Sequence, residues 1–346
     1  MKLNFRLLPL LAAFFLAATA PAADTVVYPP KAGPGAGKHI VFLTGDEEYR
    51  GEEGLPQLAK ILSQRHGFKC TVLFAINPKD GTIDPNVGGN LPGAEALDTA
   101  DIIVMLLRFR AWPDDQMKHF VDAYLAGKPI IALRTSTHAF NYPGNSTSPY
   151  AKYSYGSRAW SGGFGKQVLG ETWVNHWAKH KIEATKGLVE KGAENDPLLR
   201  GVRELFGDTD VYEAYPTADA KILFRGQALQ TLQESSAPAN YLRKRRDGQE
   251  QGINDPMMPV VWTRLYKNEA GNTNKILCTT MGSATDLKNE DLRRLLVNAC
   301  YWGANIGIPS YANVELVGEF HPSMYGFGGA RKGVKPDDLA LPAQGK

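Results

Sequence analysis

The sequence predicts an α/β protein, a three-layer sandwich in which helices cover both faces of a mostly parallel central sheet. Apolar runs of strand length occur at 39–45, 70–75, 101–107 and 129–134. Such nearly continuous apolar runs are typical of strands that are buried on both faces. Helical patterns lie between the runs, and this alternation indicates parallel strands that are joined by crossover helices.

The helical patterns have recognisable ends. One places apolar residues at helical spacing over 55–62 and stops at Gly67, and a second begins at Pro113 and stops at Gly127. Proline at the start and glycine after the last turn are ordinary helix boundaries. A last helix is predicted over 292–299. Further strands are predicted at 220–224, 258–266 and 274–282.

The N-terminus has the pattern of a secretory signal peptide over 1–23. Lys2 and Arg6 precede an apolar run over 7–18, and small residues follow it, as a signal peptide requires. The run is shorter than the roughly 20 residues that a spanning helix needs. We therefore expect an exported chain, periplasmic or secreted, with no membrane span after the signal is removed.

The charge balance argues against nucleic acid and anionic membranes as partners. The whole chain has 39 Lys and Arg against 36 Asp and Glu, and two of the basic residues lie in the predicted signal. A nearly neutral mature chain offers no electrostatic attraction to polyanions. Cys70, Cys278 and Cys300 are far apart in the chain, which excludes an all-cysteine zinc site. We expect buried free thiols, although export permits one disulfide; the sequence does not indicate an oligomeric state.

Four segments are expected along the chain. After the signal, residues 24–37 are rich in proline and glycine and predict a flexible lead-in. One α/β domain is expected over 38–310, and a glycine-rich extension over 311–346 is expected to wrap its surface. The segment 140–177 is an aromatic-rich insertion with nine aromatic residues in 38. Such an insertion is either a binding loop or lid, or a cover for the sheet edge.

Polar side chains follow four of the predicted strands. In an open parallel sheet, ligands bind beyond the carboxyl ends of the strands, near the point where the strand order reverses. We therefore expect these side chains to converge on one site. They are Asp46, Glu47, Glu48 and Arg50 after the first strand, Arg108, Arg110 and Trp112 after the third, Arg134, Ser136 and His138 after the fourth, and Ser283 and Asp286 after the last.

Two histidines raise the possibility of a metal site. If 171–180 is helical, His176 and His180 lie one turn apart on one face, a spacing that zinc helices use. A zinc protease would need a glutamate where Trp177 stands. His138 or a carboxylate from 45–48 would have to supply a third ligand for a divalent metal such as zinc. The alternative is two histidines that pack in the core or lie on the surface.

Several motifs together resemble the trehalose-utilisation (ThuA-like) family. They are "HIVFLTGDEEYR" (39–50), "ALRTSTHAF" (132–140), "DTDVY" (208–212) and "MPVVWTRLY…NKILCTTMGSATD…LRRLLVNACYWG" (258–303). The resemblance covers about 38–305. It implies a flavodoxin-like, class I glutamine amidotransferase-like fold and a role in carbohydrate metabolism, on glucosides or oxidised sugars.

Two departures exclude the amidotransferase reaction itself. That reaction needs a cysteine in the turn after the fourth strand, and "RTSTH" (134–138) has none. Gly282 and Ser283 stand where the family commonly has glycine and histidine. Without a cysteine–histidine pair, the chain is not expected to hydrolyse glutamine through a thiol. The fold therefore carries over without this chemistry.

The first functional hypothesis is an enzyme that acts on a sugar, a glucoside or an oxidised sugar. His138 would be the general acid/base or a metal ligand, with Glu48 and Asp46 as carboxylate partners. Arg108, Arg110 and Arg134 would anchor the substrate. The remaining binding candidates are Trp112, Tyr142 and Trp177, which could stack on a sugar, and Asp210, Tyr212, Ser283 and Asp286.

Two other hypotheses stay open. One is a non-catalytic carbohydrate-binding protein on the same fold, which would keep its affinity when His138 is replaced. The other is a serine hydrolase that uses Ser136 or Ser283. No G-x-S-x-G elbow surrounds Ser136, so the sequence favours this hypothesis least.

Overall fold

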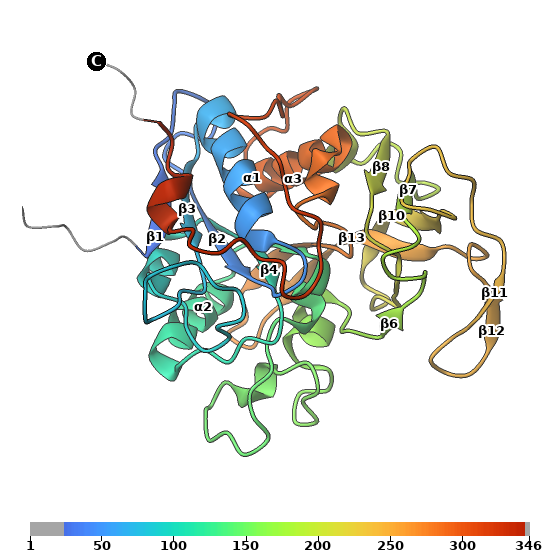
Figure 1. Cartoon of the computed structure of the whole chain (residues 1–346), viewed down its shortest axis with the longest axis horizontal. Helices are drawn as coiled ribbons and strands as arrows, with labels where there is room; N and C mark the ends of the chain where they lie inside the picture. The colour runs from blue at the N-terminus through green and yellow to red at the C-terminus, as the bar shows by residue number, and fades with distance from the viewer. Residues whose placement is uncertain (1–23, 343–346) are drawn as a thin grey trace, which may run out of the picture.

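A computed structural model describes residues 24–342 of the protein, and the predicted signal peptide over 1–23 lies outside this range. The centre of the molecule is a ten-stranded sheet with the order β1-β3-β2-β4-β5-β14-β13-β10-β7-β8 (Figure 1). Five neighbouring strands are parallel to one another. They are β3 (Lys69–Leu73), β2 (His39–Gly45), β4 (Ile102–Leu107), β5 (Ile130–Leu133) and β14 (Thr273–Thr279).

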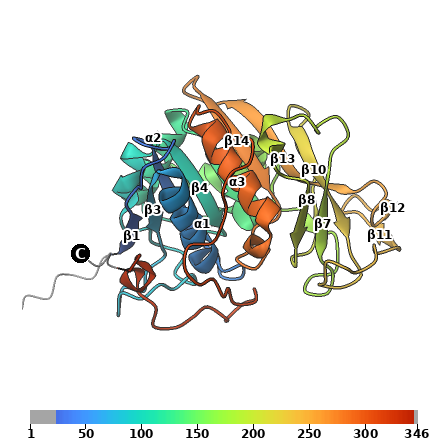
Figure 2. The ribbon, with the colours of Figure 1, turned by 90° about the horizontal axis from the view of Figure 1, so that it is seen from above.

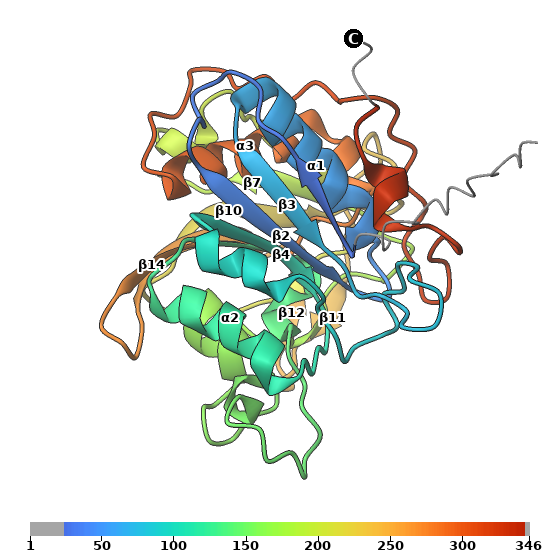
Figure 3. The same ribbon diagram turned by 90° about the vertical axis from the view of Figure 1, so that its left-hand side faces the viewer.

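Helices cover both faces of this parallel part. Helices α1 (Gly51–His66) and α3 (Glu290–Gly303) lie on one face, and α2 (Asp114–Leu125) lies on the other (Figure 3). Each face has its own apolar core, one containing Leu58 and Leu295 and the other containing Phe120. All residues of β2, β4 and β5 are buried between the two cores. The predicted three-layer α/β sandwich with a mostly parallel centre is thus confirmed.

The second half of the sheet is antiparallel. It contains β13 (Met258–Lys267), β10 (Lys221–Ala228), β7 (Thr185–Val189) and β8 (Glu204–Gly207) (Figure 2). The turn at 268–272 is too short for the crossover that parallel strands require, so β13 returns antiparallel to β14. Two small ribbons pair β6 (Asn175–His176) with β9 (Tyr212–Glu213) and β11 (Leu242–Lys244) with β12 (Glu250–Gly252).

The predicted flexible lead-in needs a correction. Its first residues form strand β1 (Thr25–Tyr28), which pairs antiparallel with β3 at the edge of the sheet. Successive side chains of a strand point to opposite faces, and Val26 and Tyr28 are the two that are buried. The Tyr28 hydroxyl also donates a hydrogen bond to the carbonyl of Leu339 at 2.8 Å. The proline and glycine residues that follow β1 obscured this short strand in the sequence.

The C-terminal segment, residues 311–342, runs along α1 and contains one short 3₁₀ turn (Pro336–Leu339) (Figure 1). His66 at the end of α1 bonds to the Asn313 carbonyl at 2.7 Å. Near the start of α1, the Gly326 amide donates to the Glu48 carbonyl at 2.8 Å. The segment therefore passes over the carboxyl end of β2 before it returns to β1.

Two further expectations concern single features. Cys70, Cys278 and Cys300 are buried free thiols, as predicted. Within residues 24–342, every helix is too short or too polar to cross a membrane.

A buried carboxyl group lies in the first turn of α1. Glu52 is 8% exposed, and within the described residues both of its carboxyl oxygens lack a hydrogen-bond partner. Burial raises the pKa of Glu52 from 4.5 to about 8. The folded protein therefore holds this proton at neutral pH, whereas the unfolded chain loses it. The free energy of unfolding decreases as the pH rises from about 4.5 to 8, because only the unfolded chain gains the hydration of the carboxylate.

We expect Glu52→Gln to remove this pH dependence. Glutamine is a neutral isostere, so the stability of the variant relative to the wild type should increase by roughly 1–4 kcal/mol between pH 4.5 and pH 8. Urea unfolding at several pH values measures the difference. Glu95→Gln, in the first turn of an exposed 3₁₀ helix, is the control and should change little. A gap between E52Q and wild type that is the same at every pH would contradict a protonated Glu52.

Candidate functional site

The candidate site lies at the carboxyl ends of the parallel strands. The sheet order reverses between β2 and β4, because α1 leads from β2 to β3 on one side and the chain then crosses to β4 on the other. This is the place where open α/β sheets bind ligands. The loops that follow β2, β4, β5 and β14 lie together at this edge of the sheet, as the sequence predicts.

The turn after β5 places a buried arginine at the centre. Arg134 has a φ of 44°, a left-handed conformation that is uncommon for a residue with a side chain. Its side chain is fully buried and bonds to the Asp210 carboxylate at 2.8 Å. The same guanidinium donates to the carbonyls of Asp210 and Thr280, each at 2.7 Å. The turn that carries a cysteine in amidotransferases thus carries an ion-paired arginine here.

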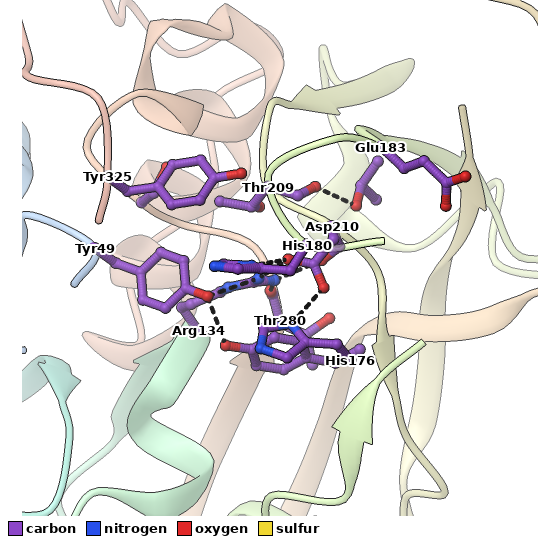
Figure 4. Close-up of polar contacts among 12 residues, drawn as sticks. Tyr49, Arg134, His176, His180, Glu183, Thr209, Asp210, Thr280 and Tyr325 are labelled. Carbon is purple, nitrogen blue, oxygen red and sulfur yellow. Dashed lines mark hydrogen bonds and ion pairs between the residues drawn. The ribbon is translucent and has the colours of Figure 1, made fainter. Parts of the chain in front are cut away.

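Asp210 in turn holds both histidines of the predicted pair. His176 Nδ1 lies 2.6 Å from one carboxylate oxygen of Asp210, and His180 Nδ1 lies 2.9 Å from the other. His180 Nε2 lies 2.9 Å from a carboxylate oxygen of Glu48. Figure 4 shows Arg134, His176 and His180 gathered around Asp210. We call Glu48, Arg134, His176, His180 and Asp210 the histidine–carboxylate cluster.

Positive and negative side chains alternate in this cluster, and each stabilises the charged form of its neighbour. Burial lowers the pKa of His180, but hydrogen bonds to Asp210 and Glu48 outweigh burial and raise it to about 9. Burial opposes ionisation of Asp210 as well, yet Arg134 and the two imidazoles hold its pKa well below the usual range. For Glu48, the bond from His180 likewise outweighs burial and lowers the pKa. His180 is therefore a cation between two carboxylates at neutral pH.

The two histidines are brought together by a backbone conformation that the sequence did not predict. The expected helix over 171–180 is wrong, because this stretch contains only the two-residue strand β6, paired with β9. The amides of Trp177 and Ala178 donate to the Val211 carbonyl at 2.9 and 3.0 Å. These long-range backbone bonds turn the chain beside Asp210, and the two imidazole centres lie 4.3 Å apart.

The cluster also has the donor atoms of a metal site. One atom each from His176, His180 and Asp210 lie within 4.8 Å of one another. Nitrogen and carboxylate donors of this kind suit zinc and related divalent metals. His138, the third predicted ligand, is outside this group. It is buried, its Nδ1 lies 3.1 Å from the Thr137 hydroxyl, and burial lowers its pKa well below the usual value. Asp210 therefore takes the place predicted for His138.

The predicted stacking residues need a correction. Trp112, Tyr142 and Trp177 are at most 9% exposed and pack in the interior, so a sugar cannot reach their faces. Three half-buried rings lie at the site instead: Phe109, Tyr155 and Trp173. The Phe109 and Trp173 rings lie 5.1 and 5.2 Å from the His138 ring, and Trp173 also lies 4.9 Å from His176. Tyr155 lies 5.0 Å from Phe109.

The aromatic residues of the insertion divide between the core and the candidate site. Phe140, Tyr153 and Phe164 belong to the core beneath α2, whereas Tyr155 and Trp173 face the site. The composition of the insertion pointed to aromatic residues at a site but not to which of them face it. Phe109 could have been found from its place directly after β4.

The three predicted arginine anchors differ in their exposure. Arg134 is fully buried and forms an ion pair with Asp210. Arg110 is 1% exposed and bonds to the Glu47 carboxylate at 2.5 Å and to the Pro85 carbonyl at 2.9 Å. Arg108 is partly exposed and bonds to Glu47 at 3.3 Å. Only Arg108 of these three therefore faces solvent at the site.

The remaining candidates have structural contacts. Asp46 accepts the Glu48 amide at 2.7 Å and the Thr135 hydroxyl at 2.5 Å, and burial raises its pKa. The Tyr212 ring lies 3.7 Å from the Arg134 guanidinium. These contacts join the loops after β2, β5 and β8, and they hold the cluster in place.

The two candidate serines are not paired with a histidine. The Ser136 hydroxyl donates to the Met105 carbonyl at 2.9 Å and accepts the Leu107 amide at 3.2 Å. Ser283 bonds to Thr285 at 2.9 Å, and Asp286 accepts the Gly282 amide at 2.8 Å. Within the described residues, these groups lack the base that a serine nucleophile needs.

The fold and the site together define an α/β protein with a histidine–carboxylate cluster at its sheet switch point. No protein-family model and no curated protein matches the chain. It is similar to two crystal structures described as a "putative thua-like protein". For the one from Parabacteroides merdae the identity is 13%, the TM-score is 0.45, and 77% of this chain and 90% of that chain are covered. For the one from Bacteroides uniformis the identity is 17%, the TM-score is 0.45, and the coverages are 79% and 92%.

A further similarity is to an exo-beta-1,4-mannosidase from Opitutaceae bacterium strain TAV5. The identity is 9%, the TM-score is 0.29, and 77% of this chain but 35% of that chain is covered. The ThuA-like neighbours carry the name of the family that the sequence motifs resemble.

We expect Arg134→Met to destabilise the protein by about 3–5 kcal/mol, because it leaves the buried Asp210 carboxylate without its guanidinium. Urea unfolding followed by circular dichroism at pH 7 measures the loss. Lys221→Met is the control, since Lys221 pairs with Asp196 at 2.6 Å but is 58% exposed. Its cost should stay below about 1 kcal/mol. Equal losses in the two variants would show that Arg134 does not hold the site together.

Proposed function

We propose that the chain is an exported ThuA-like protein of carbohydrate metabolism, an enzyme that acts on a sugar, a glucoside or an oxidised sugar. One observation carries the proposal. Asp210 holds two imidazoles at the carboxyl edge of the sheet, and half-buried aromatic rings lie beside them. Protein sites for sugars combine polar groups of this kind with aromatic faces.

His176 is the group best placed for proton transfer. Its Nδ1 bonds to the buried Asp210 carboxylate at 2.6 Å. Within the described residues, its Nε2 makes no hydrogen bond, and the side chain is 30% exposed. A carboxylate that accepts from Nδ1 fixes the tautomer, so Nε2 is free to take a proton from a substrate hydroxyl or a water. We therefore propose His176, rather than His138, as the general acid/base.

Metal-assisted chemistry is the second way in which the same cluster could act. His176, His180 and Asp210 would hold a divalent metal in place of the His180 proton, because only a neutral imidazole binds a metal. Zinc is one metal that suits these donor atoms, and His176 would then be a ligand and not the general acid/base. Such a metal, when bound, would polarise a sugar oxygen or activate a water. Arg134 would keep Asp210 in place in either case.

Metal content of the purified mature protein is the first test. If the cluster acts through a metal, mass spectrometry should find a stoichiometric divalent metal in the wild type, and His176→Ala and His180→Ala should each lose it. His138→Ala should keep it, because His138 lies outside the donor group. His119→Ala is the matched control, since His119 also bonds to a carboxylate, Asp98, at 2.6 Å. If the wild type stays metal-free after supplementation with zinc, manganese and nickel, metal-assisted chemistry is ruled out for this site.

Turnover separates an enzyme from a binding protein. Glucosides and oxidised glucosides, incubated with the protein, should be converted to products that mass spectrometry detects. His176→Ala should lower turnover by about a hundredfold or more, the usual contribution of a general acid/base, and His119→Ala should not. Sugar affinity without turnover would favour the alternative, a non-catalytic carbohydrate-binding protein.

A further inference from the structure

Arg108 is the cationic side chain at the switch point that remains open to a ligand. It follows β4 directly, opposite the loop after β2, where the sheet order reverses. Its guanidinium lies over the Phe109 ring, and that ring lies 5.1 Å from the His138 ring. The Trp173 ring lies 5.2 Å from His138 and 4.9 Å from His176. A continuous row of rings therefore connects Arg108 with the histidine–carboxylate cluster.

Most hydrogen-bond donors of Arg108 are unused. Among the described residues, its side chain makes one hydrogen bond, from Nη1 to Glu47 at 3.3 Å. Arg134 makes four side-chain bonds, and Arg110 also makes four. A guanidinium has five N–H groups in a planar fork that matches a carboxylate. Most N–H groups of the Arg108 guanidinium are thus available to donate hydrogen bonds to a ligand.

Two aromatic rings hold the Arg108 fork in place. Its central carbon lies 4.4 Å from the Phe109 ring centre and 5.0 Å from that of Phe327. Phe109 has a φ of 53°, which is unusual for a bulky residue and sets the direction of its ring. Phe327 comes from the C-terminal segment and is 59% exposed. The Phe327 ring is therefore accessible from solvent beside the Arg108 guanidinium.

The C-terminal segment is fixed where it supplies Phe327. The Gly326 amide donates to the Glu48 carbonyl at 2.8 Å, and the Arg50 side chain donates to the Gly326 carbonyl. The Tyr325 ring stacks on Tyr49 with centres 5.3 Å apart. Phe327 is therefore held at the rim by contacts on the residues immediately before it.

The local charge favours an anion. Among the described residues, Glu47 is the carboxylate that forms ion pairs with both Arg108 and Arg110, at 3.3 and 2.5 Å. Two guanidinium groups thus share the one negative charge of Glu47, and Arg108 does not have a carboxylate to itself.

We propose that Arg108, stacked between Phe109 and Phe327, binds the carboxylate of an acidic sugar, a uronic or aldonic acid, so that acidic sugars are the preferred substrates. This inference rests on the proposed function and names its substrate class. The fork binds the carboxylate through two parallel N–H bonds, and the exposed Phe327 ring packs on the apolar face of the sugar. The histidine–carboxylate cluster then faces the remainder of the ligand.

Isothermal titration calorimetry of the full chain with glucuronate, gluconate and glucose tests the proposal. The wild type should bind glucuronate or gluconate at least tenfold more tightly than glucose. Arg108→Gln should lose about tenfold or more for the acids and little for glucose, the value of a charge-assisted bidentate contact. Arg108→Lys, which keeps the charge but not the fork, should lie between. Phe327→Ala should weaken all three sugars, and exposed Arg203→Gln is the control.

The outcomes distinguish this inference from the proposed function. If glucose and the acids bind equally well and R108Q changes neither, the acidic-sugar inference is overturned while a sugar site stands. If neither kind of sugar binds the folded wild type, both are overturned. Should R108Q and R203Q lose affinity equally, the effect is one of overall charge, and Arg108 is not the carboxylate site.

Discussion

The buried ion pair between Arg134 and Asp210 is the interaction on which the site depends. It joins the turn after β5 to the segment before β9, two parts of the chain that are 76 residues apart. Burying two charges costs several kcal/mol for each ion. The cost is offset because Arg134 also bonds to two carbonyls and Asp210 also bonds to two imidazoles. Removing either Arg134 or Asp210 leaves the other buried charge without its ion-pair partner.

This pair also lies in the turn where the amidotransferase reaction would need a cysteine. The turn after β5 begins with Arg134, whose φ of 44° is in the left-handed region. Its guanidinium is fully buried and bonds to Asp210. His176 and His180 lie beyond that carboxylate, and both bond to it. The polar groups at this edge of the sheet are thus imidazoles, carboxylates and a guanidinium, with no thiol among the residues of the turn.

The sequence alone predicts the elements whose structure depends on a local pattern of residues. The apolar runs of β2, β4 and β5 and the periodicity of α1 and α2 depend on neighbouring residues, and their carboxyl-end loops converge as the sheet topology requires. The sequence does not predict the segments whose conformation depends on backbone hydrogen bonds to distant residues. Four-residue spacing suggested a helix for His176 and His180, but both amides that follow His176 bond to Val211. Asp210 was recognised as a candidate through its motif, and its place between the two histidines required the fold.

The direction in which a side chain points was also beyond the sequence. In the sequence, Trp112 and Trp177 are candidates for stacking on a sugar. In the structure both are buried in the core, where a large apolar ring is most stable. Four rings lie at the site or its rim. Phe109 comes from the loop after β4, Tyr155 and Trp173 come from the insertion, and Phe327 comes from the C-terminal segment. Each of these segments is fixed by contacts outside itself.

The C-terminal segment belongs to the site rather than merely covering the domain. It bonds to the backbone of Glu48, the carboxylate that accepts from His180, and its Tyr325 ring lies 5.7 Å from the His180 ring. The loop after β2 is therefore held from two sides, by His180 and by Gly326. The rim and the charged centre share this loop, because Glu48 bonds through its side chain to His180 and through its carbonyl to the Gly326 amide. The contacts that hold the charged centre therefore also hold the exposed Phe327 ring at its rim.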